Sequence, residues 1–147
     1  MACRACWWPV LIGATLLLFD CSVQTVGDGV HGQEMAAIRT LATLNTAQTQ
    51  YFSTYGRYAT SLTELGPPAG GGATSPSSAD LITTDLAAGM KSGYKFSMVG
   101  SPQGYGVNAE PQVYNTTGKR SFFTDQSTVI REHQGNEPAT VNDPEIK

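Results

Sequence analysis

The segment that most constrains the fold is residues 34–55, with the sequence EMAAIRTLATLNTAQTQYFSTY. Long and apolar side chains recur in it every three or four residues, and this period predicts an amphipathic helix with one buried face. The expected buried positions are Met35, Ile38, Leu41, Leu44, Gln48, Tyr51 or Phe52, and Tyr55. The opposite face is rich in threonine, a mediocre helix former because its branched Cβ restricts χ1. The helix therefore needs a partner layer that covers its apolar face.

The second half of the chain supplies that layer. From residue 91 onward the period changes to two, which predicts half-buried strands. Four strands are expected, at residues 94–99, 105–109, 120–124 and 128–132. A Ser-Pro-Gln-Gly turn joins the first two into a hairpin, and an Asp-Gln-Ser turn joins the last two. A helix followed by antiparallel strands indicates an α+β domain, in which the N-terminal helix packs on a C-terminal sheet.

Two short helical pieces are expected between the long helix and the strands. Ser61 and Glu64 have the spacing of a capping box, which predicts one helical turn. Ser78 can cap a second helix at residues 79–88, with Asp80 in its first turn. A loop rich in glycine, proline and serine, residues 66–78, separates the two.

Residues 1–21 have the features of an export signal. Arg4 precedes an apolar run at residues 7–19, which has the length of a signal h-region and is shorter than the about 20 residues that span a bilayer. The run ends in Leu-Phe-Asp-Cys, which resembles a bacterial lipobox and makes Cys21 a candidate lipidation site. Asp20 departs from that pattern, so ordinary cleavage downstream and an uncleaved anchor are alternatives. We expect an exported protein, facing the periplasm or outer membrane or extracellular, with or without a lipid anchor.

The remaining residues divide into a tether, a domain and a tail. Residues 22–33 are glycine-rich and polar and are expected to form a flexible tether. The α+β domain is expected at residues 34–132. Residues 133–147 contain two prolines and no periodicity, and we expect a disordered tail.

The residue types that carry chemistry are scarce in the expected domain. All three cysteines, Cys3, Cys6 and Cys21, lie in the signal, so the mature domain has no cysteine pair. His31 and His133 fall in segments expected to be flexible, and no serine has a nucleophile-elbow context. We therefore expect no catalytic residue, cofactor or metal site. The net charge is −3 without a basic cluster, which argues against nucleic-acid binding.

Several short sequence segments, taken in order along the chain, resemble the head domain of bacterial type IV pilin-like proteins, which include the pseudopilins. Residues 34–50 resemble the helix that follows the transmembrane segment in that family, and residues 51–55 match its tyrosine-rich end. Later segments of the chain also match the family pattern, in the same order. They are Ser61-Leu62, Leu65-Gly66, Lys91-Ser92-Gly93-Tyr94, Phe96, Tyr105, Val107, Arg120-Ser121-Phe122, Asp125 and Val129-Ile130-Arg131. The resemblance implies a helix packed on an antiparallel sheet and a role in protein contacts.

Two departures from the family pattern limit what the resemblance implies. A pilin-like protein begins with a leader ending in glycine, followed by phenylalanine and a long apolar helix that anchors the subunit. Here Gly32-Gln33-Glu34 is followed by Arg39 and several threonines, so that helix is absent. The family often carries paired cysteines near the positions of Thr60 and Phe123, and this chain has cysteine at neither. The resemblance therefore implies the fold and not filament assembly.

We thus expect a non-enzymatic envelope or secreted protein that acts through protein contacts or adhesion. Its partner would be another envelope protein, which the sequence does not identify, and the signal or a lipid would supply membrane contact. The first alternative is a minor pilin or pseudopilin subunit of a type IV pilus or type II secretion system, with residues 7–19 as a shortened core helix. The second, an envelope hydrolase, is disfavoured because neither histidine has a recognisable catalytic context.

Overall fold

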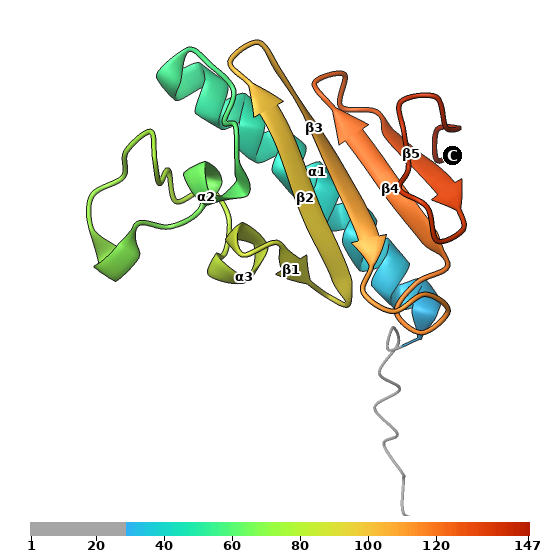
Figure 1. The fold of residues 1–147 in the computed structure, drawn as a ribbon. Coiled ribbons are helices and arrows are strands. Elements are labelled where there is room, and N and C mark those ends of the chain that lie inside the picture. Colours follow the sequence, from blue (N-terminus) through green and yellow to red (C-terminus); the bar gives the residue numbers. More distant parts are fainter. Residues whose placement is uncertain (1–28) are drawn as a thin grey trace, which may run out of the picture.

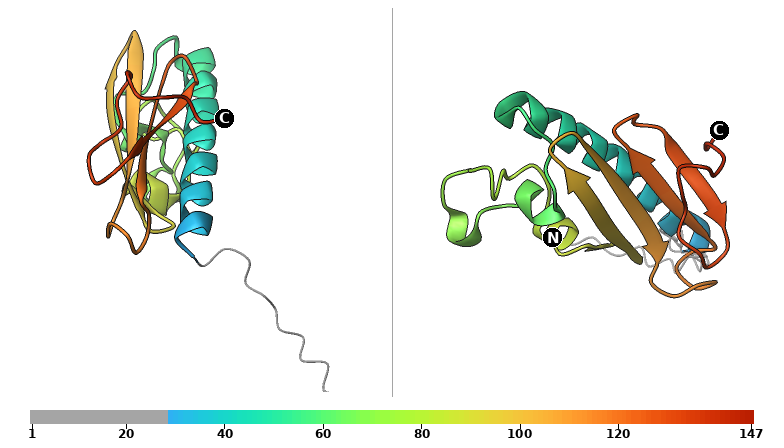
Figure 2. Two further views of the ribbon diagram at one scale, coloured as in Figure 1. Left: turned by 90° about the vertical axis from the view of Figure 1, so that its right-hand side faces the viewer. Right: turned by 45° about the horizontal axis from the view of Figure 1, so that its top comes forward.

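A computed structural model of the protein describes residues 29–147. A long helix, α1 (Val30–Tyr55), lies across one face of an antiparallel sheet, and the side view separates the two layers (Figure 1 and Figure 2). The α+β fold expected from the sequence is confirmed. The expected signal, Cys21 and most of the tether lie outside the described residues. No helix among residues 29–147 is both long and apolar enough to cross a bilayer.

The sheet is a meander of five strands, each antiparallel to the next in sequence. They are β1 (Met90–Lys91), β2 (Tyr94–Ser101), β3 (Gly104–Pro111), β4 (Arg120–Asp125) and β5 (Ile130–Gln134). The expected four strands correspond to β2 to β5, so the strand number was one too low. A two-residue strand such as β1 covers a single period of the alternation, so the sequence cannot show a repeat there.

Alternate residues of the strands face α1 and form the core with it. Phe96 lies opposite Ala109, which in turn lies opposite Phe122, and all three are buried against the helix. Phe122 therefore faces α1, whereas Phe123 points to the outer face, where its ring would contact any side chain added at Gly106. The largest fully buried apolar side chains are Leu41, Leu44, Tyr51, Leu65, Leu86, Tyr94, Val107 and Phe122.

α1 ends where the sequence indicates and begins earlier. Gly56 adopts φ 70° and donates its N–H to the carbonyl of Phe52 at 2.8 Å, which is a left-handed glycine cap. The helix starts at Val30, so the last residues of the expected tether are helical. Its buried face matches the prediction at Leu41, Leu44, Gln48 and Tyr51. It differs near the start of the helix, where Met35 is exposed and Glu34 is buried. A polar partner on the sheet, described below, accounts for the burial of Glu34.

The prediction of a helix at residues 79–88 is wrong for most of that range, because only Thr84–Ala87 is helical. The helices between α1 and the sheet are α2 (Leu62–Leu65), the 3-10 turn η1 (Ala69–Gly71) and α3 (Thr84–Ala87). Ala79 and Leu81 instead donate their N–H groups to carbonyls at the end of α2, at 2.8 Å each. Asp80 between them has φ 56°, a left-handed conformation that interrupts a helix. The short helix α3 is all that remains.

The expectation of a disordered C-terminal tail also differs from the structure. Residues 135–147, here called the C-terminal strap, fold back along the outer edge of β5 (Figure 1). Glu132 donates its N–H to Pro144 O at 2.9 Å, and Ile146 donates its N–H to Ile130 O at 3.1 Å. Ala139 of the strap is 2% exposed. Backbone pairing and a single small apolar residue leave no periodic pattern, so the sequence did not reveal this segment.

Candidate functional site

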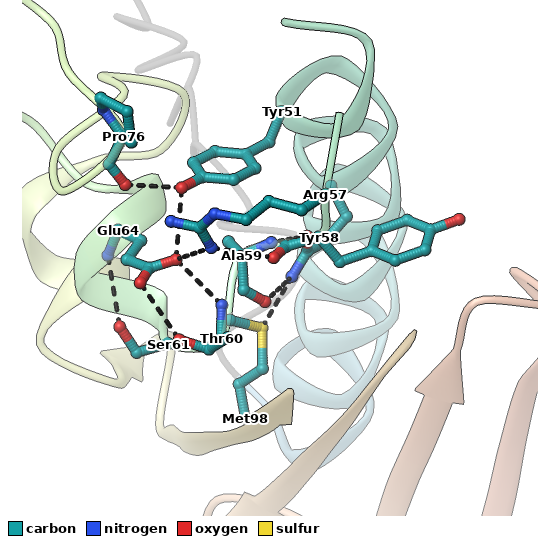
Figure 3. A network of polar contacts seen from close by, with 10 residues as sticks. Tyr51, Arg57, Tyr58, Ala59, Thr60, Ser61, Glu64, Pro76 and Met98 are labelled. Carbon is teal, nitrogen blue, oxygen red and sulfur yellow. Dashed lines mark hydrogen bonds and ion pairs between the residues drawn. The ribbon is translucent and has the colours of Figure 1, made fainter. Parts of the chain in front are cut away.

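A dense polar network lies around Glu64, where the loop after α1 enters α2 (Figure 3). Ser61 accepts the N–H of Glu64 at 3.4 Å, which is the cap that the sequence predicts. The carboxylate of Glu64 turns back to accept the N–H of Thr60 at 3.0 Å and its hydroxyl at 3.1 Å. The reciprocal bond of the capping box thus goes to the residue before Ser61.

Two side chains from α1 and its following loop complete this network. Arg57 Nη1 lies 3.0 Å from Glu64 Oε2, and the Tyr51 hydroxyl donates to Pro76 O and lies 3.3 Å from the same carboxylate oxygen (Figure 3). Burial opposes ionisation of Glu64, but the hydrogen bonds from Thr60 and Arg57 outweigh it and lower the pKa of Glu64. A carboxylate that is ionised and fully engaged holds the loop in place and is poorly suited to accept a substrate proton.

Gln48 fixes the same loop from beneath. Its side-chain amide donates to Ala59 O at 3.0 Å and accepts the Ala59 N–H at 2.9 Å, so it pairs with that backbone as a neighbouring strand would. The side-chain amide also lies 3.1 Å from Met98 Sδ on β2. The sequence places Gln48 on the buried face of the helix, but nothing in its spacing indicates this partner.

A buried network of uncharged groups joins α1 to the middle of the sheet. The side-chain amide of Asn45 donates to the Thr124 hydroxyl at 3.0 Å and to Thr128 O at 3.4 Å. Its carbonyl oxygen accepts the Tyr105 hydroxyl at 3.1 Å. These groups satisfy one another, which removes the cost of burying them and sets the position of the helix on the sheet.

A charged cluster joins α1 to the other end of the sheet. Glu34 accepts the N–H of Lys119 at 2.8 Å and lies 2.8 Å from Arg120 Nη2. Arg120 also pairs with Glu132 of β5, so one guanidinium serves two carboxylates. Glu34 is buried, and a buried charge of this kind requires such partners. A single glutamate at the start of a helical pattern gives no sequence signal of this contact.

The two histidines do not occupy the flexible segments expected for them. His31 is exposed in the first turn of α1, and His133 lies in β5. Nδ1 of His133 is 3.0 Å from Asp143 of the strap, and Asp143 also accepts the Thr140 N–H and hydroxyl. The hydrogen bond from His133, together with those from Thr140, lowers the pKa of Asp143 to about 2. Within residues 29–147, neither histidine hydrogen-bonds to a serine or threonine hydroxyl.

The described part of the chain also lacks a metal-binding group of three or more His, Cys, Asp or Glu residues. Asp125 closes the turn before β5 by accepting the Ser127 N–H at 2.8 Å, as the sequence predicts. No family model, curated protein or solved structure matches the chain. The functional argument therefore depends on the fold, its internal contacts and its surfaces.

Proposed function

We propose that this protein is an extracytoplasmic, non-enzymatic domain with a pilin-like fold that acts through protein contacts or adhesion. The observation that carries the proposal is that the buried and partly buried polar side chains bond to other parts of the same domain. Glu34, Glu64 and Asn45 all bond to neighbouring layers or loops of the same domain. Glu34 and Asn45 hold the long helix on the sheet, and Glu64 holds the loop that follows the helix. Both carboxylates are occupied by these bonds, so neither is free to act as an acid or a base on a substrate.

The solvent face of α1 supports a role in protein contact. Thr43, Thr46 and Thr54 donate their hydroxyls at 3.0 Å to backbone carbonyls four residues earlier. The hydroxyls are therefore satisfied within the helix and need no water when the face is covered. Arg39 is the only charged residue between positions 35 and 54. A face with few charges resembles the centre of a protein interface, where charged residues are depleted.

The contact can be tested by site-specific photo-crosslinking in the native cells. A photoreactive amino acid at Thr46 should give one discrete adduct with an envelope protein, whereas the same group at Gln103 in the exposed β2–β3 turn should give none. Equal labelling at both positions, or no adduct at either, would count against this contact face. Loss of a measurable hydrolytic activity on replacing His31 and His133 together would instead support an enzyme.

The mass of the intact mature protein from the membrane fraction tests the cellular setting. A diacylglyceryl group on Cys21 supports a tethered head domain, and a methylated N-terminal residue supports the minor-pilin alternative. Stoichiometric recovery of the protein in sheared, purified pili would also favour that alternative over the tethered head domain.

A further inference from the structure

The end of the domain at which α1 begins carries exposed apolar side chains beside basic ones. The first turn of α1, the β1–β2 turn and the β3–β4 loop all lie at this end (Figure 1 and Figure 2). We define the basal patch as Met90, Val113, Tyr114 and Lys119. The first three are 47%, 54% and 39% exposed, and Lys119 is exposed as well. Three large apolar side chains exposed on β1 and on the adjoining β3–β4 loop indicate a contact surface.

Direct contacts join the parts of the basal patch. Gln112 donates its N–H to Gly93 O at 2.9 Å, and its side-chain amide lies 3.5 Å from Met90 Sδ. These contacts connect the β3–β4 loop to the β1–β2 turn. Lys119 lines an open groove together with His31 from the first turn of α1. The patch therefore extends from the sheet edge to the start of the helix.

The loop that carries the patch is held in a defined shape. Asn115 donates its N–H to Gly118 O at 2.8 Å, and Val113 donates its N–H to the Thr117 hydroxyl at 3.1 Å. The N–H of Lys119 is fixed to Glu34 at 2.8 Å. Val113 and Tyr114 are thus displayed on an internally bonded turn, which lowers the entropy that ordering the loop on binding would otherwise cost.

The basal patch favours an anionic surface although the chain has a net charge of −3. Lys119 is exposed, and Lys91 lies in the adjoining strand β1. Glu34, the acidic residue that lines the same groove as Lys119, is buried and paired with Arg120. Tyrosine beside apolar residues and lysine is the combination found where proteins meet the bilayer interface, since the ring and the lysine stem are amphipathic.

The position of the patch in the chain places it near the expected membrane anchor. Residues 22–29 separate Cys21 from α1, and they span at most about 28 Å when extended. An anchor at Cys21 would hold the start of α1 within this distance of the lipid surface, and the basal patch lies at the same end of the domain. Such tethering raises the effective concentration, so a weak contact suffices.

We propose that the basal patch docks on the surface of an anionic lipid bilayer, with Val113 and Tyr114 in the interface and Lys119 among the headgroups. The α1 solvent face then points along the membrane or away from it and stays accessible to a partner protein. This inference rests on the proposed extracytoplasmic setting and on the membrane anchor expected from the sequence. It adds an orientation for the head domain that anchorage alone does not require.

The test uses the full chain mixed with vesicles of equal parts phosphatidylcholine and phosphatidylglycerol, and with vesicles of phosphatidylcholine alone. Vesicle sedimentation reports anchorage, and acetylation by a membrane-impermeant reagent, read by mass spectrometry, reports the exposure of each lysine. On anionic vesicles, Lys119 should be modified several-fold more slowly than in solution, because the headgroups that attract its amine also shield it from the reagent. Lys147 serves as the internal reference, because it follows Ile146, which pairs with the opposite end of β5.

Matched variants separate docking from anchorage. Val113→Ser combined with Tyr114→Ser should abolish the protection of Lys119 and leave sedimentation unchanged. Val141→Ser on the strap, at the same 54% exposure as Val113, should change neither readout.

Four results would overturn the proposal. The first is sedimentation of the wild-type chain without protection of Lys119, which leaves anchorage intact. The second is protection that survives in the double variant. The third is protection without vesicles that rises with protein concentration, which indicates a second copy as the occupant. The fourth is absence of sedimentation, which would overturn the expected anchorage together with the docking.

Discussion

Asn45 of α1 and Tyr105 of β3 share a buried hydrogen bond although sixty residues separate them in sequence: the tyrosine hydroxyl donates to Asn45 Oδ1 at 3.1 Å. The amide of Asn45 donates in turn to the Thr124 hydroxyl on β4 at 3.0 Å. One helix side chain thus connects two neighbouring strands. Burial raises the pKa of Tyr105 to about 12, so the phenol keeps the proton that it donates.

Asn45→Ala should lower the free energy of unfolding by about 1–3 kcal/mol, because the buried Tyr105 hydroxyl loses its acceptor. Urea denaturation followed by circular dichroism measures the change. Thr46→Ala, at the next position on the exposed side of the helix, is the matched control and should stay within about 0.5 kcal/mol of the wild type. Equal losses in both variants would contradict the role assigned to Asn45.

Glu64→Gln should destabilise the domain most near neutral pH. Burial opposes ionisation of Glu64, but hydrogen bonds from Thr60 and Arg57 lower its folded-state pKa below its usual value. A carboxylate of this kind contributes stability above its unfolded pKa of about 4.3 and loses that contribution as the pH falls through the folded pKa. The difference from wild type in urea denaturation should therefore shrink below about pH 4.

Glu137→Gln provides the control for this pH profile, because Glu137 is exposed on the strap. Its stability should follow the wild type across the same pH range. A Glu64→Gln difference that stays constant from neutral pH to acid would show that the charge of Glu64 does not matter.

Gly118→Ala should destabilise the β3–β4 loop. A Cβ at this position would clash with the Tyr94 hydroxyl, which donates to Arg120 O at 2.8 Å. Displacing the buried tyrosine should cost about 1–3 kcal/mol, as overpacking does in other cores, and lower the Tm. Gly72→Ala is the control, since its nearest contact would be 3.9 Å away. An unchanged Tm for Gly118→Ala would show that this contact is loose.

Truncation after Gly135 should expose the edge of β5, because it removes the segment that pairs with Ile130 and Glu132. An uncovered edge strand promotes association between copies. Size-exclusion chromatography over a concentration series should therefore show self-association of the truncated protein. Urea denaturation of the same protein should show reduced stability. A truncated protein that stays monomeric and equally stable would mean that the strap is not part of the fold.

The sequence was most informative where a local pattern determines structure. The alternation in the strands, the glycine cap at residue 56 and the capping pair Ser61 and Glu64 each depend on neighbours within a few residues. Those features were predicted with the correct type of element. The packing of the sheet on the helix was also predicted from the sequence, because the apolar face of the helix and the apolar face of the strands each needed a cover.

The missed features depend on contacts between distant residues. Residues 79–82 read as the start of a helix, but the carbonyls at the end of α2 take their N–H groups. The burial of Glu34 depends on Arg120, which lies eighty-six residues away. The strap has no hydrophobic pattern because it is fixed by backbone bonds and by polar side chains such as Asp143. The spacing of residues within a short stretch of sequence does not indicate such distant partners.

The meander topology has a consequence for the order of folding. Each strand pairs with its sequence neighbour, so the sheet can assemble from successive hairpins with short loop closures. Docking of α1 is different, since Asn45 meets Thr124 across seventy-nine residues. A threonine-rich helix gains most of its stability from that docking. The helix should therefore be consolidated late, and until then the apolar underside of the sheet is open to chaperones and to other chains.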